Sequence, residues 1–91
     1  MARKKVPFNK TGINKLPDDK PVLYRIETGG GRTNYAGVAQ RGRVQDRLQE
    51  HLGAIPGATV RIEQLASIQE ARQKEQRVIK RSQPKYNKNG K

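Results

Sequence analysis

Residues 21–39, with the sequence PVLYRIETGGGRTNYAGVA, predict a β-hairpin. In the first half, apolar and aromatic residues such as Val22 and Tyr24 alternate with polar ones, which is the pattern of a strand with one buried face. Three consecutive glycines then separate this run from a second strand-like run. Glycines between two strands are typical of a tight turn, and they lack the GxxxxGK spacing of a phosphate-binding loop. We therefore expect paired strands at residues 21–28 and 33–39.

The next segment predicts a helix from about Arg43 to Leu52, ended by Gly53. Its apolar residues recur at intervals of four and form a core line, and basic side chains form a parallel line beside it. The core line is Val44, Leu48 and Leu52, and the basic line is Arg43, Arg47 and His51. Residues 59–63 then alternate as a third, shorter strand.

A second helix is predicted from Ser67 to Ser82, and a carboxylate interrupts its apolar face. Ser67 supplies an N-cap, and the helix must end before Pro84. The apolar stripe consists of Ile68, Ala71, Val78 and Ile79. Glu75 falls in the middle of this stripe, where burial of a charge is unfavourable unless the charge is paired or binds a metal. Glu75 is therefore either one half of an ion pair or a functional ligand.

The composition points to an anionic partner. The chain has 91 residues, with 20 Lys and Arg against eight Asp and Glu, and a formal net charge of +12. Such an excess favours nucleic acid, and we expect no membrane span and no secretory signal, because no apolar run is long enough. Hydrophobic residues make up 32% and aromatic residues 4% of the chain, so the core is expected to be small. The absence of cysteine and the single histidine exclude disulfides and thiolate or histidine-cluster metal sites. A cytoplasmic setting fits this composition.

One domain is expected between two basic ends. Residues 1–20 carry many cations with almost no periodicity, which predicts a disordered or loosely docked basic arm that either contacts phosphates or is merely solvated. Residues 21–87 form the domain, and residues 88–91 form a basic C-terminal tail. The order of elements is β-β-α-β-α, which predicts an α+β fold with a small three-stranded antiparallel sheet and flanking helices.

Five short motifs, in this order, resemble those of the GIY-YIG nuclease family. They are Val22-Leu23-Tyr24, Tyr35-Ala36-Gly37, Arg47 to His51, Glu70 to Glu75, and Pro84-Lys85-Tyr86-Asn87. The resemblance covers residues 21–87 and implies a GIY-YIG-like fold. The chain departs from the family pattern at Val22, Leu23 and Ala36, which replace a glycine, an isoleucine and the middle residue of the second motif. The polar positions of the motifs are kept.

The resemblance also implies a catalytic site with a metal ion. The catalytic residues would be Tyr24, Tyr35, Arg47, His51, Glu75 and Asn87. Glu75 would bind one divalent cation, Mg²⁺ or Mn²⁺, because a hard cation accepts a carboxylate and keeps most of its waters. Tyr24 would orient or deprotonate the attacking water with help from Tyr35, and Arg47 would stabilise charge on the phosphate. His51 would carry a proton or donate to the phosphate, and Asn87 would brace the site.

Structural alternatives stay open for the same side chains. Strand tyrosines such as Tyr24 and Tyr35 also suit sheet packing with a hydrated hydroxyl group. Arg47 also suits a solvated ion pair with Glu50 or Asp46. A lone helix histidine is often a bystander, and an asparagine near glycine often forms a turn.

The function expected from the resemblance is a metal-dependent endonuclease that hydrolyses phosphodiester bonds in nucleic acid, above all DNA. Further cations would line the substrate groove; they are Arg41, Arg43, Lys80, Arg81 and Lys85. One alternative is a catalytically inactive nucleic-acid-binding module on the same scaffold, suggested by Val22 and the charge. A second is a ribosomal-type basic protein without an active site, suggested by size and charge alone.

Overall fold

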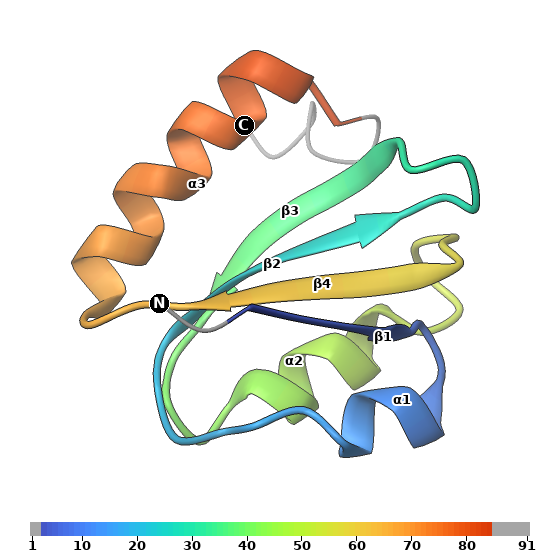
Figure 1. Cartoon of the computed structure of the whole chain (residues 1–91), viewed down its shortest axis with the longest axis horizontal. Helices are drawn as coiled ribbons and strands as arrows, with labels where there is room; N and C mark the ends of the chain where they lie inside the picture. The colour runs from blue at the N-terminus through green and yellow to red at the C-terminus, as the bar shows by residue number, and fades with distance from the viewer. Residues whose placement is uncertain (1–2, 85–91) are drawn as a thin grey trace.

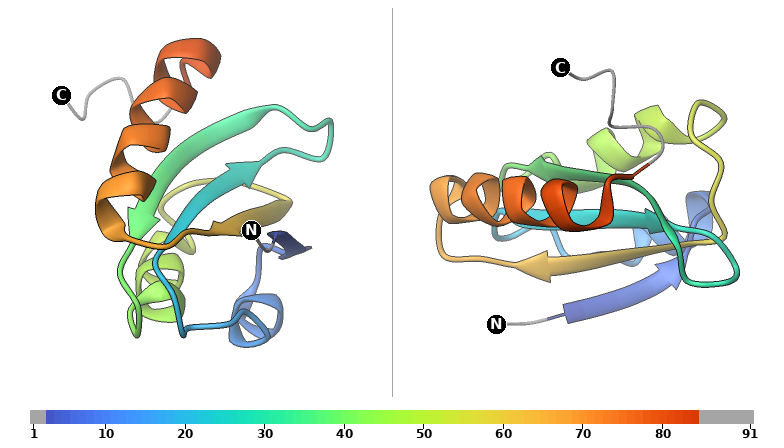
Figure 2. Two further views of the ribbon diagram at one scale, coloured as in Figure 1. Left: turned by 60° about the vertical axis from the view of Figure 1, so that its left-hand side comes forward. Right: turned by 90° about the horizontal axis from the view of Figure 1, so that it is seen from above.

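The computed structural model describes residues 3–84, which form a four-stranded antiparallel sheet with helices on both faces (Figure 1). The elements are β1 (Arg3–Pro7), α1 (Lys10–Asn14), β2 (Val22–Glu27), β3 (Thr33–Ala39), α2 (Val44–His51), β4 (Thr59–Gln64) and α3 (Ile68–Ser82). The strands lie in the order β1-β4-β2-β3. Helices α1 and α2 cover one face of the sheet, and α3 lies on the other face beside β3 (Figure 2). The predicted α+β class is confirmed.

The sheet has four strands rather than the predicted three, because residues 3–7 add a strand to the outer edge of β4. The pairing is antiparallel, with Val6 opposite Val60. Val6, Ile13 and Leu16 are all buried in the core beneath the sheet. Residues 3–16 are therefore an integral part of the fold, and the prediction of a disordered or loosely docked arm is wrong for them. The tail predicted at residues 88–91 lies outside the described residues.

The other predicted elements are confirmed within one or two residues at their ends. Strands β2 and β3 form the hairpin, and Gly31 takes a positive φ of 91° in the turn, a conformation that glycine adopts without strain. The Ser67 hydroxyl group accepts a hydrogen bond of 3.2 Å from the backbone N–H of Glu70 at the start of α3. The helix ends at Ser82, and Gln83 leaves the right-handed helical region with φ 45°.

The N-terminal segment also fixes the position of α2. The Asp18 carboxylate accepts a 2.8 Å hydrogen bond from the backbone N–H of Val44, the first residue of α2. The Gln45 side-chain amide donates to the Leu16 carbonyl oxygen at 2.8 Å. A helix N-terminus leaves several backbone N–H groups without intrahelical partners, so Asp18 caps α2 from a distant part of the sequence.

Two apolar cores lie on opposite sides of the sheet. The larger core, between the sheet and helices α1 and α2, contains Tyr24, Ile26, Leu48 and Ile62 among others. The smaller core, between α3 and the sheet, contains Leu23, Ala36, Leu65, Ala71 and Val78. Among residues 3–84, none of the helices combines the length and the hydrophobicity that crossing a bilayer would require.

Replacement of Ile13 tests the integration of the N-terminal segment. Ile13 is 0% exposed, and removal of a buried isoleucine side chain costs about 2–5 kcal/mol. We expect Ile13→Ala to lower the free energy of unfolding by about that amount in urea denaturation. The neighbouring Lys15 is exposed, so Lys15→Ala should change stability by less than about 0.5 kcal/mol. Equal stability of the Ile13 variant and the unaltered protein would show that α1 does not pack on the sheet.

Candidate active site

Two tyrosines and the single histidine meet where β2, β3 and the end of α2 converge. The Tyr24 hydroxyl group lies 2.8 Å from Nε2 of His51, which is hydrogen-bonding distance. The Tyr35 ring stacks on the Tyr24 ring with centroids 6.1 Å apart, and its centroid lies 4.8 Å from that of His51. The structure therefore brings together three of the residues predicted for the site, from segments far apart in the sequence.

Gly37 gives the Tyr24 hydroxyl group the space it occupies. Tyr24 and Gly37 lie directly opposite each other on β2 and β3. A Cβ atom at position 37 would lie 2.6 Å from the Tyr24 hydroxyl oxygen and 3.0 Å from Cε2 of Tyr35. Both distances are shorter than ordinary van der Waals contact, so a side chain at position 37 would displace the tyrosines. The glycine of the second motif thus has a steric role in the site.

The environment of Tyr24 strongly favours the protonated phenol. Tyr24 is 1% exposed, and its burial is the main cause that raises its pKa well above the ordinary value. The charge that Tyr35 would carry on ionisation raises the pKa further, while the Arg47 guanidinium group opposes the shift. Glu75 raises it as well. Arg47 and Glu75 are therefore close enough for their charges to act on Tyr24.

His51 is held in its neutral form at physiological pH. Partial burial lowers its pKa below the ordinary value, Arg47 lowers it further, and Glu50 acts in the opposite direction. A neutral imidazole donates from one ring nitrogen and accepts at the other. With its proton on Nδ1, His51 accepts a hydrogen bond from the Tyr24 hydroxyl group at Nε2.

Arg47 lines a hollow between α2 and α3. The hollow has a volume of about 230 Å³, and it is lined by Val38, Ala39, Gln40, Arg43, Arg47, Ile68 and Arg72. Arg47 is half exposed and forms a long ion pair of 3.9 Å with Glu50. An exposed pair of this kind contributes little stability, so the guanidinium group can exchange Glu50 for another anion at small cost.

Glu75 lies half-buried on α3, as the interrupted apolar stripe predicted. Its pKa is raised above the ordinary range by burial, and Arg72 opposes that shift. Among residues 3–84, no cation lies within ion-pair distance of the Glu75 carboxylate. Glu75 is therefore a partly dehydrated oxygen donor whose charge acts on Tyr24, and a carboxylate oxygen is a ligand that a hard divalent cation accepts.

The described residues contain no cluster of three or more His, Asp or Glu side chains that could form a closed metal cage. Mg²⁺ commonly uses one or two carboxylates and retains several waters. The residues present therefore fit a cation that is bound through Glu75 alone among the described side chains.

The remaining predicted residues fall into three groups. Arg43 lines the same hollow as Arg47, and Arg41 is exposed in the preceding loop. Lys80 and Arg81 are exposed on the last turn of α3, and Arg81 lines a different hollow. Lys85 and Asn87 lie outside the described residues.

Sequence reasoning missed two residues that shape the site. Arg72 lines the hollow across from Arg47 and carries the charge that opposes the pKa shift of Glu75. Its position three residues before Glu75 on a predicted helix was a usable signal, because residues at that spacing share a helix face. Asp18, the cap of α2, had no such local signal.

Replacement of Gly37 tests the steric arrangement around Tyr24. We expect Gly37→Ala to lower the free energy of unfolding by about 1–3 kcal/mol, because overpacking a closed site forces side chains off their preferred positions. Urea denaturation measures the change. Gly29→Ala is the matched control, since a Cβ there meets only the Ala58 Cβ at 4.0 Å. Equal effects of the two substitutions would contradict a specific role for position 37.

Titration of His51 by NMR tests the electrostatics. The chain has one histidine, so its ring signals are unambiguous. We expect a pKa below the ordinary value of about 6.5, and Arg47→Gln should raise it because a repelling charge is removed. Arg61→Gln, on the other face of the sheet, should leave it unchanged.

The same pKa shift has a consequence for stability. Because the unfolded chain binds the histidine proton more tightly than the folded one, stability should rise as the pH rises through about 6.5. A folded-state pKa at or above about 6.5 would refute the neutral imidazole.

The fold of the chain is similar to that of the GIY-YIG N-terminal endonuclease domain of UvrC from Thermotoga maritima, which was solved bound to its catalytic divalent cation, magnesium. That domain is 26% identical to the chain and matches with a TM-score of 0.68, covering 82% of this chain and 94% of the solved chain. A tyrosine-to-phenylalanine variant of the same domain is 25% identical, with a TM-score of 0.68 and coverage of 82% and 93%. An asparagine-to-alanine variant is 24% identical, with a TM-score of 0.66 and coverage of 81% and 92%.

No protein-family model and no curated protein matches the chain. The match to solved structures nevertheless spans most of both chains. The predicted resemblance is confirmed at the level of structure: this chain has the GIY-YIG fold.

Proposed function

We propose that this chain is a divalent-metal-dependent endonuclease that hydrolyses phosphodiester bonds in nucleic acid, with DNA as the expected substrate. The observation that carries the proposal is the hydrogen bond between Tyr24 and His51, placed beside Tyr35 and within the electrostatic influence of Arg47 and Glu75. This arrangement occurs on the fold of an endonuclease domain that binds a catalytic magnesium ion.

Tyr24 and His51 form a path for one proton. Hydrolysis requires that the attacking water lose a proton as its oxygen bonds to phosphorus. Because the phenol is protonated, Tyr24 cannot act as a standing base. Instead the Tyr24 hydroxyl oxygen accepts the proton from water while its own proton passes to Nε2 of neutral His51. Tyr35, stacked on Tyr24, holds the phenol in place and offers a second hydroxyl group to the water or phosphate.

Arg47 binds the scissile phosphate. Its half-exposed guanidinium group lines the hollow between α2 and α3. A guanidinium group can donate two parallel hydrogen bonds to phosphate oxygens and stabilise the charge that develops during attack. Arg43 and Arg72 on the walls of the same hollow attract the flanking phosphates, and Arg41 and Lys80 are proposed to extend this contact.

Glu75 holds the divalent cation through its carboxylate. When bound, Mg²⁺ or Mn²⁺ neutralises charge on the phosphate and on the leaving oxygen. A bound cation would also offset the cost of burying the Glu75 carboxylate, because it would replace the hydration that burial removes. Asn87, which lies outside the described residues, is proposed to donate to the phosphate or brace the site.

Val22 does not obstruct this site. It stands where the first motif of the family has glycine, but its side chain is 0% exposed and packs in the core beneath the sheet. The core thus accommodates the larger residue, and Val22 is not among the residues that line the hollow with Arg47. This packing favours the endonuclease over the inactive nucleic-acid-binding module.

A cleavage assay with Mg²⁺ or Mn²⁺ tests the proposal on single-stranded, duplex and branched DNA and on RNA. We expect metal-dependent cutting that stops in EDTA and in Glu75→Gln. Tyr24→Phe removes the proton path and should slow cutting by about 10²–10⁴-fold. Glu70→Gln is the matched control, because Glu70 is an exposed glutamate on the same helix, and it should retain activity.

Thermal unfolding separates metal binding from catalysis. A ligand that binds only the folded state raises its stability, so Mg²⁺ should raise the melting temperature of the unaltered protein and of Glu70→Gln but not of Glu75→Gln. Tight binding of nucleic acid without any cutting by the unaltered protein would refute the endonuclease and leave the inactive binding module.

A further inference from the structure

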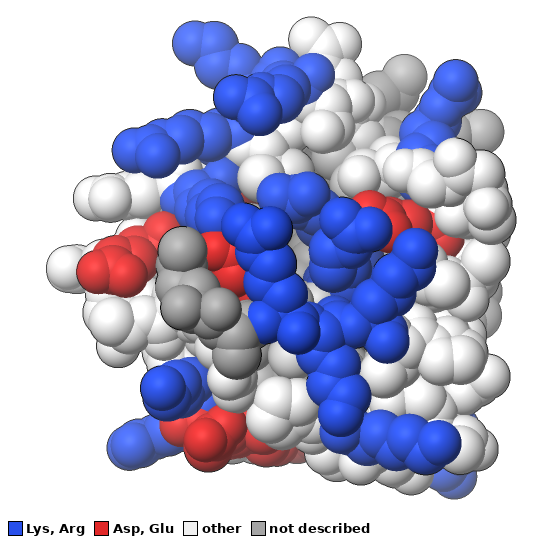
Figure 3. All heavy atoms as spheres, in the orientation of Figure 1, with Lys and Arg blue, Asp and Glu red and all other residues white. Residues whose placement is uncertain are grey.

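A second basic surface lies on the face of the sheet that α3 covers only in part. Figure 3 shows Lys and Arg side chains gathered across the middle of this face and along the neighbouring side of α3. Two adjoining hollows share Arg25 of β2. The larger, of about 240 Å³, lies between β2 and α3, and the smaller, of about 50 Å³, is lined by residues of β1, β2 and β4. We call this surface the basic groove; its cations are Arg3, Arg25, Arg61, Lys74, Arg77 and Arg81.

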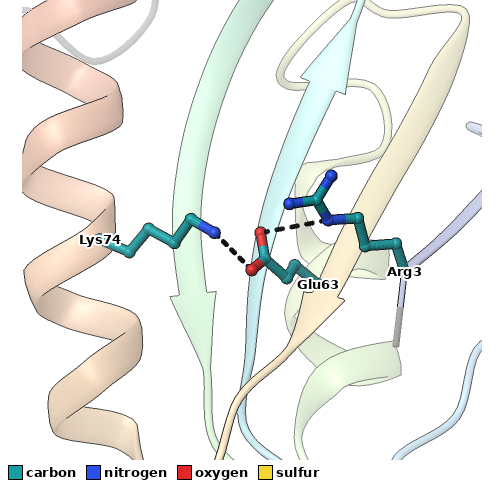
Figure 4. A network of polar contacts seen from close by, with 3 residues as sticks. All are labelled: Arg3, Glu63 and Lys74. Carbon is teal, nitrogen blue, oxygen red and sulfur yellow. Dashed lines mark hydrogen bonds and ion pairs between the residues drawn. The ribbon is translucent and has the colours of Figure 1, made fainter. Parts of the chain in front are cut away.

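Two buried carboxylates hold several of these cations in place. Glu63 is 5% exposed and pairs with Lys74 from α3 and with Arg3 from β1, at 3.8 Å for the latter (Figure 4). Glu27 is 4% exposed and lies 3.6 Å from Arg61. Buried carboxylates need such partners because dehydration of an unpaired charge is costly. The ion pairs therefore link β1, β4 and α3 across the floor of the groove.

Three arginines of the groove have no carboxylate partner among the described residues. Within the described part of the chain, Arg25, Arg77 and Arg81 form no ion pair. Arg25 stands at the junction of the two hollows, and the other two line the side formed by α3. Cations therefore outnumber the one carboxylate, Glu63, in the described lining of the two hollows, and this excess of positive charge attracts anions.

The basic groove is separate from the candidate active site. Tyr24 and Tyr35 belong to the opposite face of the sheet, against α1 and α2. Arg72 lines the active-site hollow, whereas Lys74, Arg77 and Arg81 line the groove. Helix α3 thus presents different side chains to the active-site hollow and to the basic groove.

We propose that the basic groove binds the phosphate backbone of a nucleic acid, as a second contact surface beyond the candidate active site. That the ligand is anionic is inferred from the cations that line the groove, whereas its identity as a nucleic acid rests on the proposed function. Guanidinium groups spaced along two joined hollows suit an anion with repeating phosphates. The apolar residues in its lining, Leu23, Ile62 and Val78, are buried, so the groove offers nothing to insert into a membrane.

Binding of a short fluorescein-labelled DNA duplex, followed by anisotropy in EDTA on the Glu75→Gln background, tests this proposal without cleavage. The groove variant is Arg25→Gln with Arg77→Gln. The matched control is Lys10→Gln with Lys15→Gln, which removes the same charge from the first residue and the C-cap of α1, the helix beneath the other face. We expect the groove variant to bind roughly tenfold more weakly and the salt dependence of log K to become shallower by about 2, since each lost phosphate contact removes about 0.9 from that slope.

Equal weakening by the groove and control variants would overturn the proposal, because net charge alone would then explain binding. Binding of the unaltered protein to phosphatidylserine vesicles in preference to DNA would also overturn it. Arg77→Gln alone, at an exposed helix position, guards against misfolding of the double variant and should give about half of its effect on the slope. If the groove variant binds DNA more weakly but the unaltered protein cuts nothing in the cleavage assay, only the proposed function is refuted. If the unaltered protein cuts DNA but the groove variant binds DNA as tightly as the control variant, only the groove proposal is refuted.

Discussion

The close approach of the Tyr24 hydroxyl group to Gly37 is the constraint on which the candidate site depends. Across the hairpin, the missing side chain of one residue makes room for the hydroxyl group of the other. With that space filled by the phenol, Tyr24 reaches His51 at the end of α2 and stacks on Tyr35. The site therefore requires the register of the hairpin to be correct, because a slip by one residue would turn Tyr24 to the other face of the sheet.

Burial and charge together keep the centre of this site neutral. The low exposure of Tyr24 opposes the phenolate, and partial burial and Arg47 oppose the imidazolium form of His51. Permanent charges act on this neutral pair from outside: Arg47, which lines one hollow together with Arg72, and Glu75 both influence the pKa of Tyr24. Among the described residues, the hollow itself is lined by arginines and no carboxylate, so it favours an anionic group.

Most of the fold was predictable because local periodicity determines it. The hairpin, α2 and α3 each have a clear apolar pattern, and Glu75 attracted attention because it interrupts one. Strand β1 was missed because Val6 is its one buried residue among cations, which gives no alternation to recognise. Asp18 as a cap was unpredictable because its partner, Val44, lies far along the chain. Arg81 was predicted to line the substrate groove because it is a helix cation, but it lines a different hollow from Arg47, and that position depends on how α3 packs.

The place of β4 in the sheet has a consequence for how the chain folds during synthesis. Strand β4 lies between β1 and β2, so β1 has no partner in this sheet until β4, which follows β2 and β3 in the sequence, has been synthesised. Contacts between such distant segments form slowly, and an unpaired strand edge invites association with other chains. The consecutive cations Arg3, Lys4 and Lys5 repel the same strand of a neighbouring nascent chain. The same cations that leave β1 without a recognisable apolar alternation thus oppose its pairing with other chains before β4 is available.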